Sequence, residues 1–144
     1  MVLLDRPSYR LSRGYLLLSL FYMGLIFYLS SLPGSALGPD TPVWRLLSNL
    51  AHIPLFGGLG VCLAMTFRQW TWRSRAVGTL GVGLAYALFD EVHQGFVPGR
   101  TMSISDVGLD LIGVAAALCL LWFAVTGAMP GHPLKTRQPQ GAAE

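Results

Sequence analysis

Charged residues are scarce in this sequence, and their scarcity indicates which solvent surrounds the protein. Only 12% of the 144 residues are Asp, Glu, Lys or Arg, whereas soluble domains carry roughly 25%. Hydrophobic residues make up 53% of the chain. This composition excludes an ordinary water-soluble domain and predicts a single-domain protein whose surface faces a lipid bilayer.

Cysteine is almost absent as well. Cys62 and Cys119 each lie inside a long apolar run, which excludes a disulfide scaffold. No CxxC pair or spaced Cys/His set predicts a zinc site, and we expect neither a metal nor another cofactor. The net charge of +3 is modest and comes without a basic stripe, so nucleic acid is not an expected partner.

Four apolar segments predict membrane-spanning helices, each of which needs about 20 residues. The first is longer than the apolar part of a cleaved signal peptide, so we expect it to be retained. The third spans a membrane only if its helix continues past the acid at Asp90. The four segments are Gly14–Leu32, Leu50–Phe67, Ala76–Val97 and Asp106–Val125.

The distribution of Lys and Arg predicts the orientation of these helices. Eight of the ten fall in the N-terminal arm, the second connection and the C-terminal tail, and two fall in the first and third connections. Because cytoplasmic loops carry the excess of Lys and Arg, we expect both termini in the cytoplasm, below a bacterial inner membrane. The sequence therefore predicts an all-α membrane protein, a bundle of four transmembrane helices over residues 1–127, with a disordered cytoplasmic tail over residues 128–144.

Polar residues gather at the outward end of the last three predicted helices. An ionisable side chain inside a membrane costs roughly 2.5–3.5 kcal/mol on insertion scales, so such residues must pair, face inward or line a wet cavity. Spacings of three and four residues predict that Asp90, His93 and Gln94 share a helix face. Arg100 is the only cation of the third connection and the expected partner of the carboxylates. The predicted binding residues are His52, Asp90, Glu91, His93, Gln94, Arg100, Asp106 and Asp110.

Three other interpretations of these residues stay open. A salt-bridge network could simply pin the helices together. An enzyme could use Asp90 or Glu91 as general base and His93 as acid or base, although no serine stands in a nucleophile motif. A divalent cation could be held by Asp90 and His93 with His52 and Asp110, although the spacing matches no strong metal signature.

The segment DEVHQGFVPGRTMSISDVGLDLIG, from Asp90 to Gly113, resembles the signature of the VanZ-like family. The family pattern is Asp-Glu-x-His-Gln, then Phe-x-Pro-Gly-Arg, then an Asp. An Asn comes four residues after this Asp, and a Gly comes three residues after the Asn. The sequence departs from it at Asp110, where the family usually has asparagine. In the upstream element SNLAHIPLFGGLG, His52 matches, whereas Asn49 replaces a common lysine and Phe56 a common tyrosine.

The resemblance extends over roughly residues 14–125 and implies a small integral membrane protein. The founding member of the family is associated with teicoplanin resistance, without an established mechanism. Some relatives carry a phosphotransbutyrylase label, which we reject because an outward-facing site has no access to a cytosolic acyl-CoA.

The expected function is to bind or handle an amphiphilic cell-envelope molecule, lipid-linked or glycopeptide-like, in an outward-facing polar pocket. Arg100 would contact an anionic group of that molecule, and Glu91 and His93 its headgroup. The alternatives are an envelope hydrolase or transferase that acts on a lipid-linked substrate through Glu91 and His93, and a structural or partner-binding membrane subunit.

Overall fold

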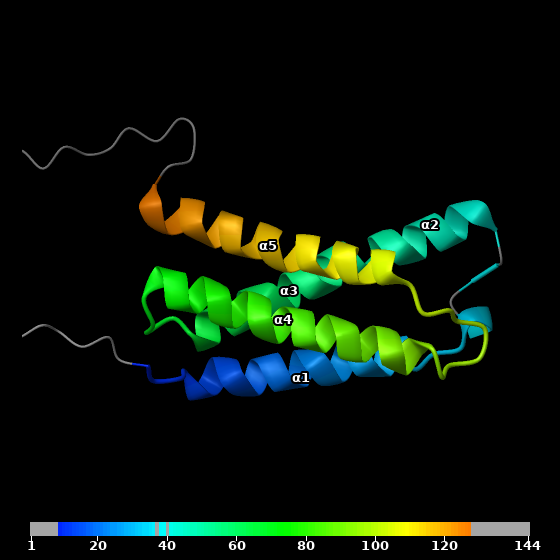
Figure 1. Cartoon of the computed structure of the whole chain (residues 1–144), viewed down its shortest axis with the longest axis horizontal. Helices are drawn as coiled ribbons and strands as arrows, with labels where there is room; N and C mark the ends of the chain where they lie inside the picture. The colour runs from blue at the N-terminus through cyan, green and yellow to red at the C-terminus, as the bar shows by residue number, and fades with distance from the viewer. Residues whose placement is uncertain (1–8, 37, 40, 128–144) are drawn as a thin grey trace, which may run out of the picture.

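The computed structural model describes residues 9–36, 38, 39 and 41–127, and within these ranges every regular element is helical. This confirms the predicted all-helical class. The predicted tail over residues 128–144 lies outside the described residues, as does Arg6 of the N-terminal arm. The elements are α1 (Arg13–Ser30), η1 (Gly34–Ala36), α2 (Pro42–Leu50), α3 (His52–Thr66), α4 (Trp72–Gln94) and α5 (Ile104–Thr126) (Figure 1).

α3 lies at the centre of the bundle, where it packs against α1, α4 and α5. The best-buried core side chains include Phe56 and Leu59 of α3, Ala87 of α4 and Val114 of α5. The described ends of the chain and the α3–α4 connection lie at one end of the bundle (Figure 1). The α1–α2 and α4–α5 connections lie at the other end, which is where the predicted binding residues come together.

α4 begins four residues before the segment that its apolar character predicts. Thr71 caps the helix, because its Oγ1 accepts a hydrogen bond from the backbone N–H of Ser74. The segment 68–75, which separates the second and third predicted spans, therefore contains the first turn of α4. The helix continues through the acidic residues to Gln94, as the predicted third span requires.

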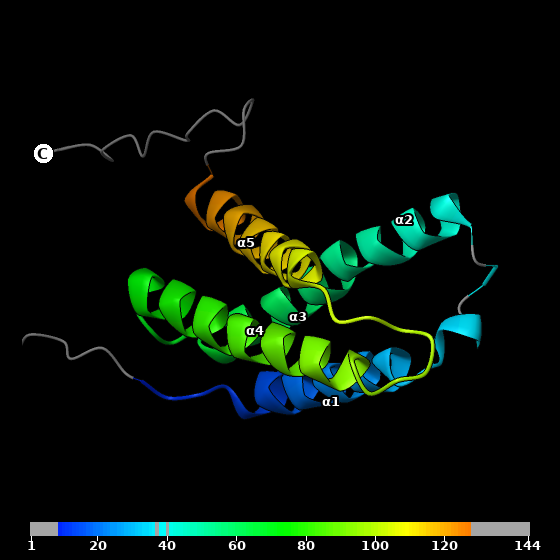
Figure 2. The same cartoon turned by 45° about the vertical axis from the view of Figure 1, so that its right-hand side comes forward.

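α2 is a helix that the sequence analysis does not predict, and it projects from the bundle (Figure 2). Thr41 caps its start, and Pro42 occupies its first turn, where a missing N–H costs no helical hydrogen bond. Apart from α3, α2 packs only against α5 among the described helices, and none of its residues is buried. Val43, Leu46 and Leu47 are each more than half exposed, so α2 presents an apolar face to its surroundings.

Glycines allow α3 and α5 to pack with their backbones in contact, as the small residues of the predicted helices suggest. A Cβ atom on Gly113 would collide with the carbonyl oxygen of Ile53 and lie 2.9 Å from the backbone nitrogen of Gly57. This close approach brings the start of α3 against the first turns of α5. It thereby places His52 beside Asp110.

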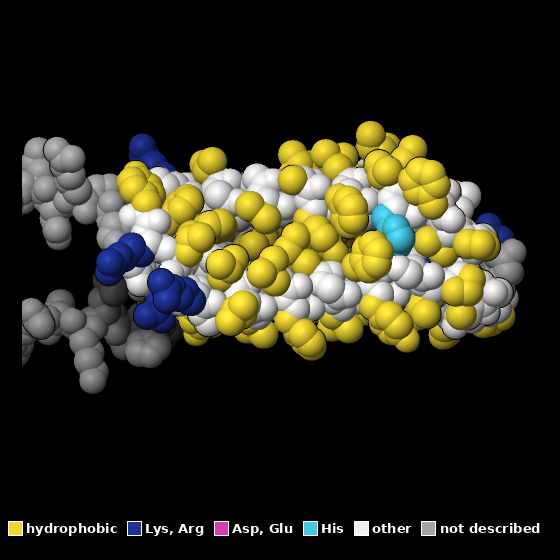
Figure 3. Space-filling view, turned by 90° about the horizontal axis from the view of Figure 1, so that it is seen from below, with side chains coloured by type: hydrophobic (Ala, Val, Ile, Leu, Met, Phe, Trp, Pro, Cys, Tyr) yellow, Lys and Arg dark blue, Asp and Glu magenta, His cyan; other side chains and the backbone are white. Residues whose placement is uncertain are grey.

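The outer surface of the bundle is apolar. In Figure 3, hydrophobic side chains cover the visible face between its ends, and no Asp or Glu side chain appears on that face. Three helical stretches are long and apolar enough to cross a membrane: α1, the α2–α3 stretch Pro42–Thr66, and α5. α4 is as long as α5, at 23 residues, but it carries arginines at its start and carboxylates near its end and is not among the three.

Candidate functional site

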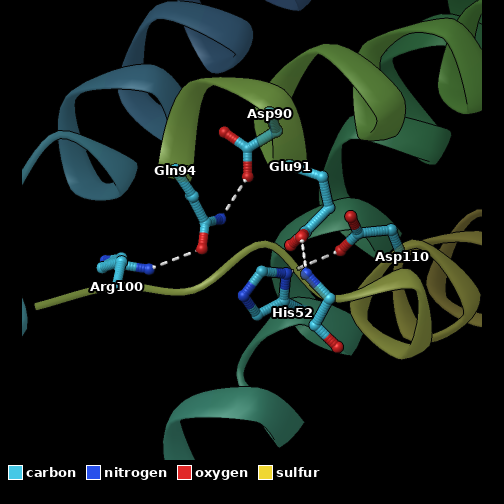
Figure 4. Close-up of polar contacts among 7 residues, drawn as sticks. His52, Asp90, Glu91, Gln94, Arg100 and Asp110 are labelled. Carbon is cyan, nitrogen blue, oxygen red and sulfur yellow. Dashed lines mark hydrogen bonds and ion pairs between the residues drawn. The ribbon is translucent and has the colours of Figure 1, made fainter. Parts of the chain in front are cut away.

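Four carboxylates are buried at the end of the bundle that carries the α1–α2 and α4–α5 connections. Asp90 and Glu91 come from the end of α4, Asp106 and Asp110 come from the start of α5, and none is more than 7% exposed. Figure 4 shows three of them with His52, Gln94 and Arg100. Buried carboxylates are costly unless they are paired, hydrogen-bonded or protonated, so their partners define the site.

His52 pairs with Asp110 and fixes the start of α3 to α5. Nδ1 of His52 lies 2.9 Å from Oδ1 of Asp110 (Figure 4). Asp110 has no exposed surface, and the imidazole ring lies parallel to the ring of Phe56, one helical turn further along α3. The pair therefore joins two helices through a carboxylate that has no contact with solvent.

Gln94 connects Asp90 to Arg100. Its Nε2 donates a hydrogen bond to Oδ2 of Asp90 at 2.7 Å, and its Oε1 accepts one from Nη1 of Arg100 at 3.0 Å (Figure 4). The prediction that Asp90 and Gln94 share a helix face is confirmed. The expected direct ion pair of Arg100 with a carboxylate does not form among the described residues, because the Gln94 amide lies between the two charges.

Arg100 also ties the end of α1 to the α4–α5 connection. Its Nε and Nη2 donate to the carbonyl oxygens of Leu32 and Leu29 at 3.3 and 3.2 Å, and carbonyls at a helix end lack helical partners. Burial lowers the pKa of the Arg100 guanidinium from its ordinary value, and the nearby carboxylates, Asp90 first, oppose that shift. The guanidinium stays charged at neutral pH.

Replacing Arg100 by alanine is expected to lower the free energy of unfolding by about 2 kcal/mol, because hydrogen bonds to a charged group are lost. Arg100→Lys should recover less than half of this loss, since an ammonium group cannot reproduce the fork of a guanidinium. Unfolding by SDS in mixed micelles, followed by circular dichroism, measures both variants. An unchanged unfolding curve for Arg100→Ala would contradict the anchoring role.

Each buried carboxylate keeps one oxygen without a hydrogen-bond partner among the described residues. Glu91 accepts a hydrogen bond from the backbone N–H of Ser103 through Oε2, while its Oε1 has none. One oxygen each of Asp90, Asp106 and Asp110 likewise has no hydrogen-bond partner among the described residues. Buried oxygens of this kind require a proton, a water molecule or a bound donor. The site therefore has unused capacity to accept hydrogen bonds.

His93 lies apart from this group, on the side of α4 that faces α1. Its Nε2 is 2.9 Å from Oγ of Ser31, and its ring stacks on Phe27 with a centroid distance of 4.3 Å. Asp90, His93 and Gln94 were predicted to share one helix face, but His93 points to α1 and away from the other two. Glu91 and His93 contact different elements and do not form one acid–base pair.

A polar pocket with a volume of about 740 Å³ opens beside the buried carboxylates. Small-molecule sites measure about 300–1,000 Å³, so this pocket has a suitable size. Asp90, Glu91 and Asp110 lie behind its lining, and His93 is not part of it. Four of the eight predicted residues line the pocket: His52, Gln94, Arg100 and Asp106.

The sequence matches the model of the family described as VanZ/LLP1 over residues 15–125. The chain belongs to the VanZ/LLP1 family. The match includes both elements on which the resemblance was based, around His52 and from Asp90 to Gly113. No protein with a curated description and no solved structure matches the chain significantly.

Apart from Arg100, the residues that α2 and the α4–α5 connection contribute to the pocket of this VanZ/LLP1 protein were not predicted from the sequence. Its wall includes Ser48 and Asn49 of α2 as well as Thr101 and Ser103. A helical signal for α2 was present. The apolar residues at positions 43, 46, 47 and 50 recur at helical spacing, and the residues between them, at 44, 45, 48 and 49, face the pocket together with His52.

The geometry does not favour the metal interpretation of this VanZ/LLP1 site. Within the described part of the chain, no three or more His, Cys, Asp or Glu side chains are arranged to hold a metal ion. The hypothetical ligand set joins His93 to His52, Asp90 and Asp110, and His93 instead contacts α1.

Proposed function

We propose that this VanZ/LLP1 protein crosses the bacterial inner membrane four times, with both termini in the cytoplasm and the pocket at the outer surface. The length of α4 supports a fourth span, because 23 residues extend about 34 Å at 1.5 Å per residue. α4 also runs alongside the other long helices in both views (Figures 1 and 2). The described arginines of the N-terminal arm and the α3–α4 connection lie at the end opposite the pocket, where the positive-inside rule requires them.

The proposed function is to bind or handle an amphiphilic cell-envelope molecule, with its headgroup in the pocket and its hydrocarbon part in the bilayer. The observation that carries this proposal is a polar pocket of about 740 Å³ at the end of an apolar bundle. Lipid-linked precursors and lipoglycopeptides have this combination of polar and apolar parts. The association of the family with teicoplanin resistance is consistent with such a ligand.

The lining supports a division of roles among the binding residues. Asp106 lines the pocket and has a buried oxygen without a hydrogen-bond partner in the described ranges, so it can accept a hydrogen bond from a hydroxyl, amide or ammonium group of the headgroup. Arg100 has five N–H groups, of which three donate within the protein, and the others can reach an anionic group. His52 and Gln94 hold the deeper carboxylates in place.

The enzymatic alternative has less support from these contacts. Glu91 is held by the backbone of Ser103, and His93 is held by Ser31, so an acid–base mechanism that uses both would have to separate each from its partner. Binding requires no such rearrangement.

Native mass spectrometry of the full chain, extracted gently from its own membrane, tests the proposal. We expect a retained amphiphile with a polar headgroup. Asp106→Asn and Asn49→Ala should each reduce its occupancy about five-fold, because one hydrogen bond contributes about 1 kcal/mol. Asn49 is exposed at the pocket wall, so its loss should leave the fold intact.

Gln69→Ala is the matched control, since Gln69 is equally exposed but lies in the α3–α4 connection at the opposite end. This variant should retain the amphiphile. A protein without bound amphiphile, or occupancy that is equal in all variants, would refute the binding function and leave the polar residues a structural role.

A further inference from the structure

The end of the bundle opposite the pocket is basic and has no acidic counterpart in the described ranges. Figure 3 shows Lys and Arg side chains gathered at this end. The described acidic residues are one pair from α4 and one pair from α5, and both pairs belong to the pocket end. The arginines of the basic end are Arg10, Arg13, Arg68, Arg73 and Arg75.

Arg75 is the arginine whose surroundings point to an anion. Its side chain is 9% exposed, and its buried Nε has no hydrogen-bond partner among the residues that the structure describes. The contacts of the guanidinium are a weak one to Sδ of Met65 at 3.4 Å and the ring of Trp72, whose centroid lies 5.2 Å away. A buried cation with no anionic partner is unfavourable, so this position favours a bound anion.

An apolar groove of about 360 Å³ between α4 and α5 starts at the same place. Trp72 lines it and is also the ring beneath Arg75. Trp72 contacts Trp122 of α5 across the groove, with ring centroids 5.0 Å apart. Further along, the lining consists of small or aliphatic side chains that include Ala76, Leu80 and Ala115. The apolar groove thus leads away from Arg75, a cation that has no anionic partner among the described residues.

We propose that this groove binds an anionic phospholipid of the inner leaflet. One acyl chain lies between α4 and α5, and the phosphate lies against Arg75 and Arg73, which is exposed in the first turn of α4. Tryptophan and arginine at the membrane interface provide the apolar and charged contacts that such a lipid requires.

The charge of this end favours a lipid over a second copy of the chain. A symmetric partner would bring its own Arg73 and Arg75 to the same contact, and like charges would face each other. Phosphatidylglycerol brings a negative charge and a hydrocarbon chain together, and it therefore complements both parts of the site.

The test is native mass spectrometry of the full-length chain from nanodiscs of equal parts phosphatidylglycerol and phosphatidylcholine. We expect retained phosphatidylglycerol to be enriched about five-fold over phosphatidylcholine for each contributing arginine. Arg73→Gln and Arg75→Gln should each reduce this enrichment about five-fold. Arg13→Gln, which removes the same charge at the start of α1, should leave the enrichment unchanged.

A second pair of variants tests the groove without changing charge. Ala115→Phe fills it, whereas Ala116→Phe adds the same ring at an exposed position outside the groove lining. Loss of bound phosphatidylglycerol in the first variant alone supports the proposal. Equal retention in both variants, equal binding of the two lipids, or a change in subunit number in place of lipid loss would overturn it.

Discussion

Replacing His52 by alanine is expected to lower the free energy of unfolding by about 3–5 kcal/mol. Asp110 has no exposed surface, and within the described part of the chain its bonded oxygen has only His52 as a side-chain partner. Removing one member of a buried pair leaves the other without compensation, which costs about this much. Unfolding by SDS in mixed micelles, followed by circular dichroism, gives the free energies of both proteins.

Two further variants separate the loss of a partner from the loss of packing. Asp110→Asn keeps the side-chain volume and can still accept from His52, so it should cost less than about 1.5 kcal/mol. It also installs the residue that is usual in the family. The double variant His52→Leu with Asp110→Leu should be close to the wild type, because apolar residues of similar volume often replace a buried pair without loss. A cost below about 1 kcal/mol for His52→Ala would show that the pair is not buried.

Gly113→Val is expected to lower the free energy of unfolding on the order of 3 kcal/mol, at the upper end of the usual cost of overpacking. A Cβ atom at this position meets the backbone of Ile53 and Gly57, which cannot rotate away as a side chain can. α3 and α5 must therefore separate, and the His52–Asp110 contact must lengthen. The same SDS titration measures the loss.

Gly108→Ala is the control for Gly113→Val, because both glycines lie in α5 and a Cβ atom on Gly108 has nothing within 4 Å. Alanine has the higher helix propensity, so this variant should be neutral or more stable by up to about 1 kcal/mol. Equal effects at the two positions would contradict the backbone contact between α3 and α5.

The helical class and the approximate positions of the long helices could be predicted because each of these helices contains an apolar run. The predicted Asp106–Val125 became α5, with Ile104 and Thr126 as its ends. The prediction missed α2 because its short apolar pattern adjoins a loop rich in Pro and Gly. It also placed the start of α4 too late, because a hydropathy pattern does not detect the Thr71 cap.

The site was predicted where its contacts are local and missed where they are not. On a helix, residue 94 lies about 40° from residue 90, whereas residue 93 lies about 60° away in the opposite direction. Gln94 therefore bonds to Asp90, while His93 reaches Ser31 of the α1 end. The pairing of His52 with Asp110 joins positions 58 residues apart, and only the packing of α3 on α5 determines it.

The two sides of the pocket differ in how firmly they are held. On one side, Gly34 donates a backbone hydrogen bond to Pro98 at 3.1 Å, and Arg100 bonds to the end of α1, so two connections form a single rigid rim. On the other side, α2 has no buried residue and joins α3 at Ala51. At this joint the backbone N–H of Ala51 donates to Leu47 and its carbonyl oxygen accepts from Leu55, so α2 is held to the bundle chiefly through α3. The exposed face of α2 is apolar, so on the proposed topology the less firmly held side of the pocket is also the side that borders the lipid.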